Sequence, residues 1–194
     1  VDDIQVITPM RKGNLGANAL NKALQEALNP YASYKKQLEF GGRTFRVNDK
    51  VMQVKNNYDI EWTTENDDGI GVFNGDMGRI TAIDEEWEMV RVLFDDGKEV
   101  EYESAQLEEL DLAYATTVHK SQGSEFDVVI IPVISGPPML LTKNLLYTAV
   151  TRAKRMVVLV GAKQSLAMMV HNRSTLKRAT MLKEFLIEGS TINA

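Results

Sequence analysis

Two short polar segments carry the residue types best suited to binding a phosphate group. The segment His119-Lys-Ser-Gln-Gly-Ser-Glu125 lies between two apolar runs, and Arg152 ends a helical pattern just before a third run. An arginine stays charged, and its planar guanidinium can bind two phosphate oxygens at once. Tight polar turns at strand ends are where α/β sheets bind ligands. The segments therefore indicate a site for a phosphorylated ligand, although Gly123 could serve only the turn and Arg152 only the helix end.

The sequence contains no phosphate-binding loop to accompany these segments. Such a loop needs a glycine-rich turn followed by Gly-Lys and then Ser or Thr. At Gly97-Lys98, Val92 stands in place of the first glycine and Glu99 in place of Ser or Thr. The apolar run that ends at Asp84-Glu85 resembles a Mg²⁺-binding Walker B strand, but it lies among hairpin signals. We interpret it as an antiparallel strand that ends in a solvated turn, so the chain predicts only half of a nucleotide site.

The elements that must position these segments follow an α/β pattern. Short apolar runs without strict alternation are typical of strands covered on both faces; they span residues 4–8, 112–118, 128–133 and 156–160. Helical spacing predicts helices over residues 18–28, from Thr142 to Ala153, near 164–170 and over 175–187. Strands that alternate with helices predict a parallel, three-layer α/β sheet. Because a normal crossover needs at least about ten residues, the link between the second and third strands must be tight.

The middle of the chain follows a different pattern. Residues 98–103 alternate strictly, and Asp96-Gly97 separates them from the apolar run 89–94, which is a hairpin signal. Further strands are expected over residues 47–55 and 79–83, whereas the polar stretch 58–71 is expected to be a mobile loop. Short antiparallel strands at regular spacing predict a barrel of about five strands.

Charge divides the chain in the same way. Residues 1–40 carry 5 basic and 4 acidic side chains, residues 41–110 carry 7 and 18, and residues 111–194 carry 10 and 5. We therefore expect an acidic insert, residues 41–110, within a mildly basic domain made of residues 1–40 and 111–194. Phosphate contacts are expected from the basic flanks.

Composition excludes several other kinds of protein and site. The chain has no cysteine and only 2 histidines, so disulfides and thiolate metal sites are ruled out and a transition-metal site is disfavoured. No apolar run approaches the roughly 18–20 residues of a membrane span. With 44% hydrophobic and 25% charged residues, the chain is expected to be a cytoplasmic globular protein without membrane contact.

Four segments in order resemble the RecD family of superfamily 1B DNA helicases, which includes the exodeoxyribonuclease V alpha chain. Residues 5–13 resemble motif IV, and residues 71–78 resemble part of the SH3-like barrel that is inserted into the second motor domain. Residues 117–126 resemble motif V, and residues 147–152 resemble motif VI. The resemblance covers nearly the whole chain. It implies a RecA-like parallel α/β sheet of the P-loop NTPase type with an inserted small SH3-like antiparallel β-barrel.

The resemblance also implies a nucleotide site in a cleft between two RecA-like domains. Arg152 would be the arginine finger on the γ-phosphate of ATP, a role worth roughly 10³–10⁵ in rate. Glu125 would approach the ribose, and Gln122, Gly123 and Arg11 would lie near the phosphates. ATP and Mg²⁺ would both need the first motor domain of the same polypeptide, whose Walker motifs are missing here.

Single-stranded DNA is the partner that the resemblance implies. Thr116, Thr117, His119 and Lys12 would contact its backbone, which positions a strand without reading its sequence. Subunits of a recombination complex are further possible partners. As the sequence lacks the first motor domain, we expect it to be a C-terminal part of a helicase of DNA repair and recombination, inactive alone.

Two other functions stay open. The chain could be a non-catalytic module that binds DNA or a partner protein, or part of a superfamily 1 RNA helicase. The joint presence of Arg152, Gln122 and Glu125 favours the enzyme part, because a scaffold has no need of all three.

Overall fold

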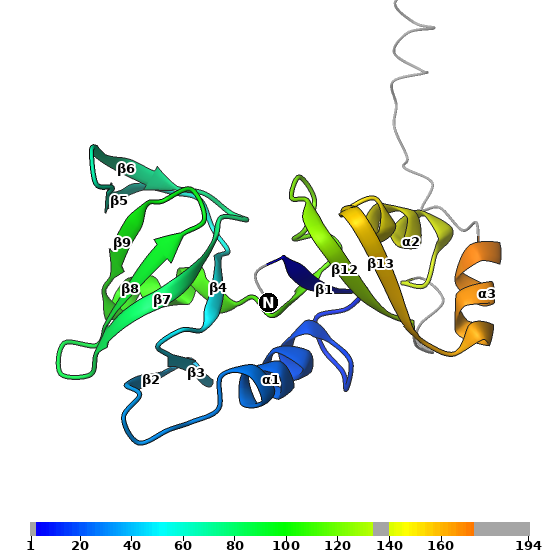
Figure 1. Ribbon diagram of the computed structural model, residues 1–194, viewed down its shortest axis with the longest axis horizontal. Helices are drawn as coiled ribbons and strands as arrows, with labels where there is room; N and C mark the ends of the chain where they lie inside the picture. Colours follow the sequence, from blue (N-terminus) through cyan, green and yellow to red (C-terminus); the bar gives the residue numbers. More distant parts are fainter. Residues whose placement is uncertain (1–2, 134–139, 173–194) are drawn as a thin grey trace, which may run out of the picture.

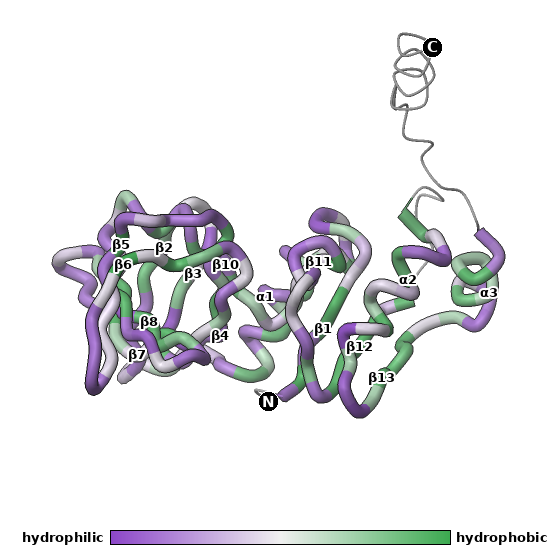
Figure 2. Tube along the Cα trace, turned by 90° about the horizontal axis from the view of Figure 1, so that it is seen from above, coloured by the Kyte–Doolittle hydropathy of each residue, from purple (hydrophilic) through white to green (hydrophobic). Residues whose placement is uncertain are grey.

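The chain forms a parallel α/β part and an antiparallel barrel, which lie side by side in Figure 1. The computed structural model describes residues 3–133 and 140–172, and the helix expected over residues 175–187 lies outside these ranges. Along the tube in Figure 2, apolar segments coincide with strands of both parts, and polar segments coincide with many of the turns.

The parallel sheet has the strand order β11-β1-β12-β13, and all its neighbours pair in parallel. Its strands are β1 (Ile4–Thr8), β11 (Ala115–Thr117), β12 (Phe126–Val133) and β13 (Ala153–Gly161). Three helices accompany it: α1 (Ala17–Leu28), α2 (Lys143–Val150) and α3 (Lys163–His171). The expected parallel α/β sheet is confirmed.

Helix α2 begins where the sequence predicts. The Thr142 hydroxyl oxygen accepts a hydrogen bond from the backbone N–H of Leu145 at 3.2 Å, which satisfies one of the free donors of the first turn. Leu146 and Ala149 form the buried side of the helix, and Ala149 packs with Val129 of β12. This packing fixes the end of α2, from which the chain passes through Arg152 into β13.

Strand β13 differs from the expectation that both of its faces are covered. It is the edge strand of the described sheet, and Met156, Val158 and Val160 are exposed by 57%, 37% and 55%. On the opposite face, Ala153 and Val157 pack against the cluster that contains Ala149, whereas Leu159 is exposed. Within residues 3–133 and 140–172, one face of this strand is therefore exposed and the other is covered only in part.

The barrel is built from a 7-stranded sheet in the order β10-β4-β7-β8-β9-β5-β6, and the pairs between its strands are antiparallel. The strands are β4 (Lys50–Gln53), β5 (Asn57–Thr63), β6 (Asp68–Val72), β7 (Met77–Asp84), β8 (Met89–Phe94), β9 (Glu99–Tyr102) and β10 (Leu110–Leu112), and the 3₁₀ helix η1 (Ser104–Glu109) precedes β10. A separate hairpin joins β2 (Gln37–Phe40) to β3 (Arg43–Arg46). The run that ends at Asp84 is a barrel strand, as we interpreted it.

The prediction of a mobile loop over residues 58–71 is wrong. Strands β5 and β6 form a hairpin there, closed by a hydrogen bond of 2.8 Å from the Thr64 N–H to the Asp67 carbonyl oxygen. The hairpin is polar because most of β5 faces solvent, and only Ile60 is fully buried in the barrel core. Gly69 lets the Trp62 ring lie flat against β6, because a Cβ atom there would come within 2.5 Å of that ring.

The run 112–118, predicted to be one strand, is divided between the two parts. Leu112 ends β10 and pairs with β4 of the barrel, whereas Ala115 begins β11 and pairs with β1. The amide of Gln5 holds the crossing by donating to the carbonyl oxygens of Ala113 and Tyr114 at 3.1 and 3.3 Å. The same chain segment thus joins the barrel to the parallel sheet.

Candidate functional site

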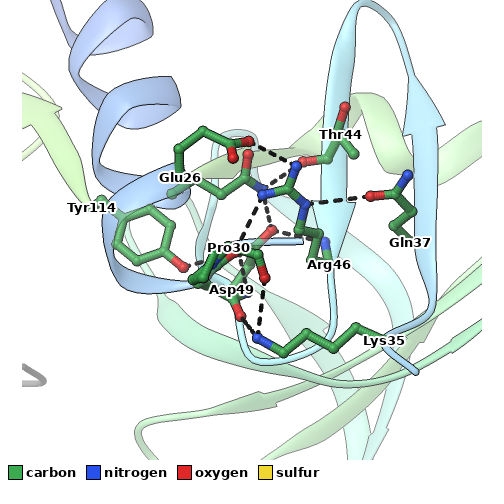
Figure 3. Close-up of polar contacts among 10 residues, drawn as sticks. Glu26, Pro30, Lys35, Gln37, Thr44, Arg46, Asp49 and Tyr114 are labelled. Carbon is green, nitrogen blue, oxygen red and sulfur yellow. Dashed lines mark hydrogen bonds and ion pairs between the residues drawn. The ribbon is translucent and has the colours of Figure 1, made fainter. Parts of the chain in front are cut away.

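A buried carboxylate ties α1 to the entrance of the barrel (Figure 3). Asp49 is fully buried and accepts four hydrogen bonds: from the side-chain amides of Gln25 (2.5 Å) and Asn29 (2.7 Å), the backbone N–H of Arg46 (2.7 Å) and the hydroxyl of Tyr114 (2.9 Å). Burial raises the pKa of Asp49, and these donors oppose that rise. Because Tyr114 directly precedes β11, this network fixes how the chain enters the motif V segment.

Residues 117–126, which resemble motif V and are called the motif V segment below, form a tight polar turn between β11 and β12, as the sequence predicts. The backbone N–H of Ser121 donates to the Thr117 carbonyl oxygen at 3.0 Å, and the Ser121 hydroxyl donates to Val118 at 3.0 Å. Gly123 has φ +92°, a conformation that favours glycine. The turn leaves the predicted ligand residues His119, Gln122, Gly123 and Glu125 exposed to solvent.

Arg152 lies against this turn. Its Nη1 donates to the Ser124 carbonyl oxygen at 3.2 Å, and its Nε donates to the Thr148 carbonyl oxygen of α2 at 3.3 Å. Near Arg152, the Nζ atom of Lys154 lies 3.8 Å from Oε2 of Glu125. The structure therefore brings Arg152 and Glu125 together at the start of β12 and β13, although 27 positions separate them in the sequence.

A cavity of about 390 Å³ lies beside Glu125, between the start of β12 and two barrel turns. It is strongly acidic, and its lining includes Asp3, Asp76, Asp95, Asp96, Glu125 and Asp127 but only two lysines. The negative charges of these carboxylates repel a negatively charged phosphate in this cavity. Neither Arg152 nor Gln122 lines it, so the cavity does not coincide with the predicted phosphate contacts.

The described residues do not offer a Mg²⁺ site of their own. Within residues 3–133 and 140–172, no group of three or more histidine or acidic side chains is arranged to hold a metal ion. The guanidinium of Arg152 and the exposed turn at Gln122 and Gly123 do suit phosphate oxygens. The residues present thus fit the phosphates of a nucleotide.

The remaining predicted residues lie at the opposite end of the parallel strands. Arg11 follows β1, and its carbonyl oxygen accepts from the backbone N–H of Asn18 at 3.1 Å, which folds the loop against α1. Arg11 lines a small hollow with Thr116, Thr117 and Lys120, away from Arg152. Thr116 is only 3% exposed, whereas His119 and Lys12 are exposed.

Sequence reasoning did not single out Asp111, Arg43 or Lys120, which meet beside this hollow. Asp111 lies 3.4 Å from Lys120 and 3.6 Å from both Arg43 and Arg11. Lys120 lies inside the segment that resembles motif V, so its position in the sequence could have indicated a role in binding, whereas Arg43 lies in the acidic middle of the chain.

None of the helices in the described ranges is long and apolar enough to span a membrane.

Comparison with known proteins is consistent with a chain made of a barrel and a parallel α/β part. Residues 20–94 match the family model of the ATP-dependent RecD-like DNA helicase SH3 domain, and residues 112–160 match that of the UvrD-like helicase C-terminal domain. The chain is 38% identical over 152 residues to the ATP-dependent RecD2 DNA helicase of Deinococcus radiodurans, covering 78% of this chain and 19% of the relative. It is 37% identical over 123 residues to the RecBCD enzyme subunit RecD of Mycolicibacterium smegmatis, covering 63% and 21%.

Solved structures show the same fold. A Bacteroides Pif1 helicase in complex with ADP-AlF3 and ssDNA superposes with a TM-score of 0.54 at 18% identity, covering 98% of this chain and 46% of that one. The Candida albicans Pif1 helicase superposes with a TM-score of 0.51 at 14% identity, covering 99% and 50%. The chain spans about a fifth of the length of these two curated relatives. The two domain matches and these relatives together place the chain with the RecD-like helicases, whose SH3 domain and UvrD-like C-terminal domain it contains.

Proposed function

We propose that the chain is the second motor part of an ATP-dependent DNA helicase of repair and recombination, acting in the cytoplasm. The observation that carries this proposal is the contact of Arg152 with the exposed turn at residues 122–125. A cation held beside an open polar turn is the arrangement that a shared phosphate site needs. The names of the relatives support an ATP-driven DNA enzyme rather than a scaffold.

Arg152 acts as the arginine finger in this proposal. Two of its donors are held by the carbonyl oxygens of Ser124 and Thr148, so the side chain is positioned before any ligand arrives. Its Nη2 has only a long contact of 3.5 Å to the Thr151 hydroxyl oxygen, which leaves donors for an incoming phosphate. A guanidinium so placed stabilises the charge that develops on the phosphoryl oxygens during transfer.

The nucleotide site is completed by the first motor domain. That domain supplies the phosphate loop and the Mg²⁺ ligands, and ATP then provides the transferable phosphoryl group. On this chain, Glu125 is placed to accept from the ribose hydroxyls, while Gln122 and Gly123 present donors to phosphate oxygens. The division into an insert of residues 41–110 and a surrounding motor domain is part of this proposal.

Single-stranded DNA crosses the opposite end of the parallel strands. Lys12 and His119 are exposed in the loops that follow β1 and β11, and the half-buried Thr117 lines the hollow beside β1. Thr116 supports the strand end from inside, because its side chain is buried. Recombination-complex subunits are further proposed partners, since curated relatives include RecBCD subunits.

Nucleic-acid stimulation of ATP turnover tests this function. In a complete protein that contains this chain, we expect single-stranded DNA to accelerate ATP hydrolysis more than single-stranded RNA of the same length. Stronger stimulation by RNA would favour an RNA helicase, and absence of ATP hydrolysis with either strand would favour a binding module.

A further inference from the structure

Three cationic side chains from distant parts of the sequence meet at one carboxylate. Asp111 Oδ2 lies 3.4 Å from Lys120 Nζ and 3.6 Å from an Nη of Arg11, and Asp111 Oδ1 lies 3.6 Å from Arg43 Nη1. Arg11 follows β1, Arg43 begins β3, and Lys120 belongs to the turn after β11. We call these four residues the Asp111 cluster. Its three cations exceed its one carboxylate by two charges.

Contacts other than Asp111 hold the side chain of Arg43 and the backbone on either side of the Asp111 cluster. Arg43 Nη1 also donates to the Leu110 carbonyl oxygen, and the guanidinium carbon lies 5.6 Å from the centre of the Phe45 ring. The Lys120 backbone N–H faces the Thr117 hydroxyl oxygen at 3.4 Å. The loop that carries Arg11 is fixed to α1 by the hydrogen bond to Asn18. The guanidinium of Arg43 is thus fixed by contacts besides Asp111, and the backbone segments that carry Arg11 and Lys120 are fixed near it.

Asp111 alone does not satisfy the donors of the cluster. Its distances of 3.4–3.6 Å exceed the roughly 2.7–2.9 Å of a strong charge-assisted hydrogen bond. The pKa of Lys120 is lowered mainly by burial, and repulsion from Arg11 and Arg43 lowers it further against the attraction of Asp111. A second anion at this place would therefore relieve repulsion among the three cations.

The cluster lies where two hollows meet. A cavity of about 450 Å³ runs along α1 to the turn of the β2–β3 hairpin, and its charged lining residues are the cations Arg11, Lys22, Arg43 and Arg46 and the carboxylates Glu26, Glu108 and Asp111. The small hollow beside β1 shares Arg11 and Asp111 with it and continues to Thr117 and Lys120. An extended chain of phosphates thus has a path from the motif V strand end past the cluster.

We propose that Arg11, Arg43 and Lys120 bind a backbone phosphate of single-stranded nucleic acid, and that Asp111 is the counter-ion that this phosphate displaces. The proposal rests on the function proposed above. It assigns Arg11 to the nucleic acid, because Arg152 and Glu125 line neither hollow. It also gives the β2–β3 hairpin a role in binding, although the middle of the chain is acidic.

Asp111 has a definite consequence for affinity. While it is ionised it competes with the phosphate for the same three cations, so it weakens binding and eases release of the strand. Removing its charge must then strengthen binding, whereas removing a cation must weaken it. These opposite signs separate an electrostatic role from a structural one, because loss of folding would not raise affinity.

The test is the salt dependence of binding of a fluorescent oligothymidylate to the full chain, measured by anisotropy. For Arg43→Gln and Lys120→Gln we expect about tenfold weaker binding at low salt and a log–log salt slope smaller by about 0.7, the value for one phosphate on a single strand. For Asp111→Asn we expect binding several-fold tighter than that of the wild type. The matched control is Arg91→Gln, on an exposed arginine of β8 that pairs with Glu99 and Glu101 and lines neither hollow.

Specific outcomes would overturn the proposal. Wild-type binding together with unchanged affinity and slope in Arg43→Gln and Lys120→Gln would remove the phosphate site while leaving the proposed helicase function intact. Altered affinity of Asp111→Asn for Mg·ATP but not for oligothymidylate would make the cluster a nucleotide site instead. A wild-type chain that does not bind oligothymidylate at low salt would contradict both the cluster site and the DNA contacts of the proposed function.

Discussion

Two side chains, Arg152 and Asp49, hold together segments that are far apart in the sequence. Arg152 bridges α2 and the turn before β12 through backbone carbonyl oxygens. Asp49 bridges α1, β3 and Tyr114 through four donors. The position of Arg152 between a helix and a strand was predictable, because a helical pattern precedes it and an apolar run follows it in the sequence. Asp49 was not, because an aspartate becomes a structural centre only through partners that the fold supplies.

Replacing Asp49 by asparagine should destabilise the fold. The N–H₂ group of the asparagine cannot accept a hydrogen bond, so at least one of the four buried donors would lose its acceptor. We therefore expect the free energy of unfolding to fall by about 2–4 kcal/mol. Urea denaturation measures this change. Asp59→Asn, on an exposed aspartate of β5, is the control and should stay within about 0.5 kcal/mol of the wild type. Equal stability of the two variants would show that the network contributes little.

The raised pKa of Asp49 also predicts a pH dependence. Because burial raises the folded-state pKa above the ordinary 3.8, the unfolded chain loses this proton first. The contribution of Asp49 to stability is therefore complete below about pH 3.8 and declines as pH rises through the folded-state pKa. We expect the advantage of the wild type over Asp49→Asn to be larger near pH 4 than at about pH 7, measured by urea denaturation. The reverse trend would mean that the four donors outweigh burial.

Among the elements, those with a strong local pattern were predictable and those that depend on distant partners were not. The strands 4–8 and 128–133, the helix after Thr142 and the hairpin at Asp96-Gly97 all formed as expected. The β5–β6 hairpin escaped prediction because its solvent-facing polar side chains hide the period of two. The division between β10 and β11 escaped because only the barrel and the parallel sheet together determine which strand pairs with which.

Helix α2 depends on its cap. Thr142→Ala removes the acceptor for the Leu145 N–H, so the free energy of unfolding should fall by about 1 kcal/mol, measured by thermal or urea denaturation. Thr142→Ser should keep most of the stabilisation by the cap, since the serine hydroxyl oxygen can accept the same hydrogen bond. The control is Thr148→Ala within the same helix, whose hydroxyl donates only to the Asn144 carbonyl oxygen. A loss of stability in Thr148→Ala as large as that in Thr142→Ala would contradict a specific capping role.

At the scale of the whole molecule, the residues that we propose to be functional lie at two ends of one parallel sheet. Arg152 and Glu125 lie at the start of β12 and β13, and Arg11, Thr117 and Lys120 lie where β1 and β11 end. The order of the motifs in the sequence did not separate these two ends. It did not predict that Arg11 lies with Lys120 rather than with Arg152, because that depends on the direction of each strand and on contact with the β2–β3 hairpin.

The isolated chain should not hydrolyse ATP. The sequence contains no phosphate loop, and the described residues provide no group of side chains for Mg²⁺. We expect phosphate release from the purified chain to equal that of a buffer control, with or without single-stranded DNA. Turnover that is lost in Arg152→Ala would show that this chain forms an active site without a first motor domain.

The most direct test of the account is the effect of Arg152→Ala on ATP turnover in a complete protein that contains this chain. If Arg152 is the arginine finger, kcat should fall by about 10³-fold or more while the affinity for ATP changes by only a few fold. Arg155→Ala is the matched control, because this exposed arginine of β13 pairs only with Asp127 at 3.4 Å among the described residues. It should keep turnover near that of the wild type. Turnover by Arg152→Ala close to that of the control would contradict the finger role and the proposed motor function of this chain.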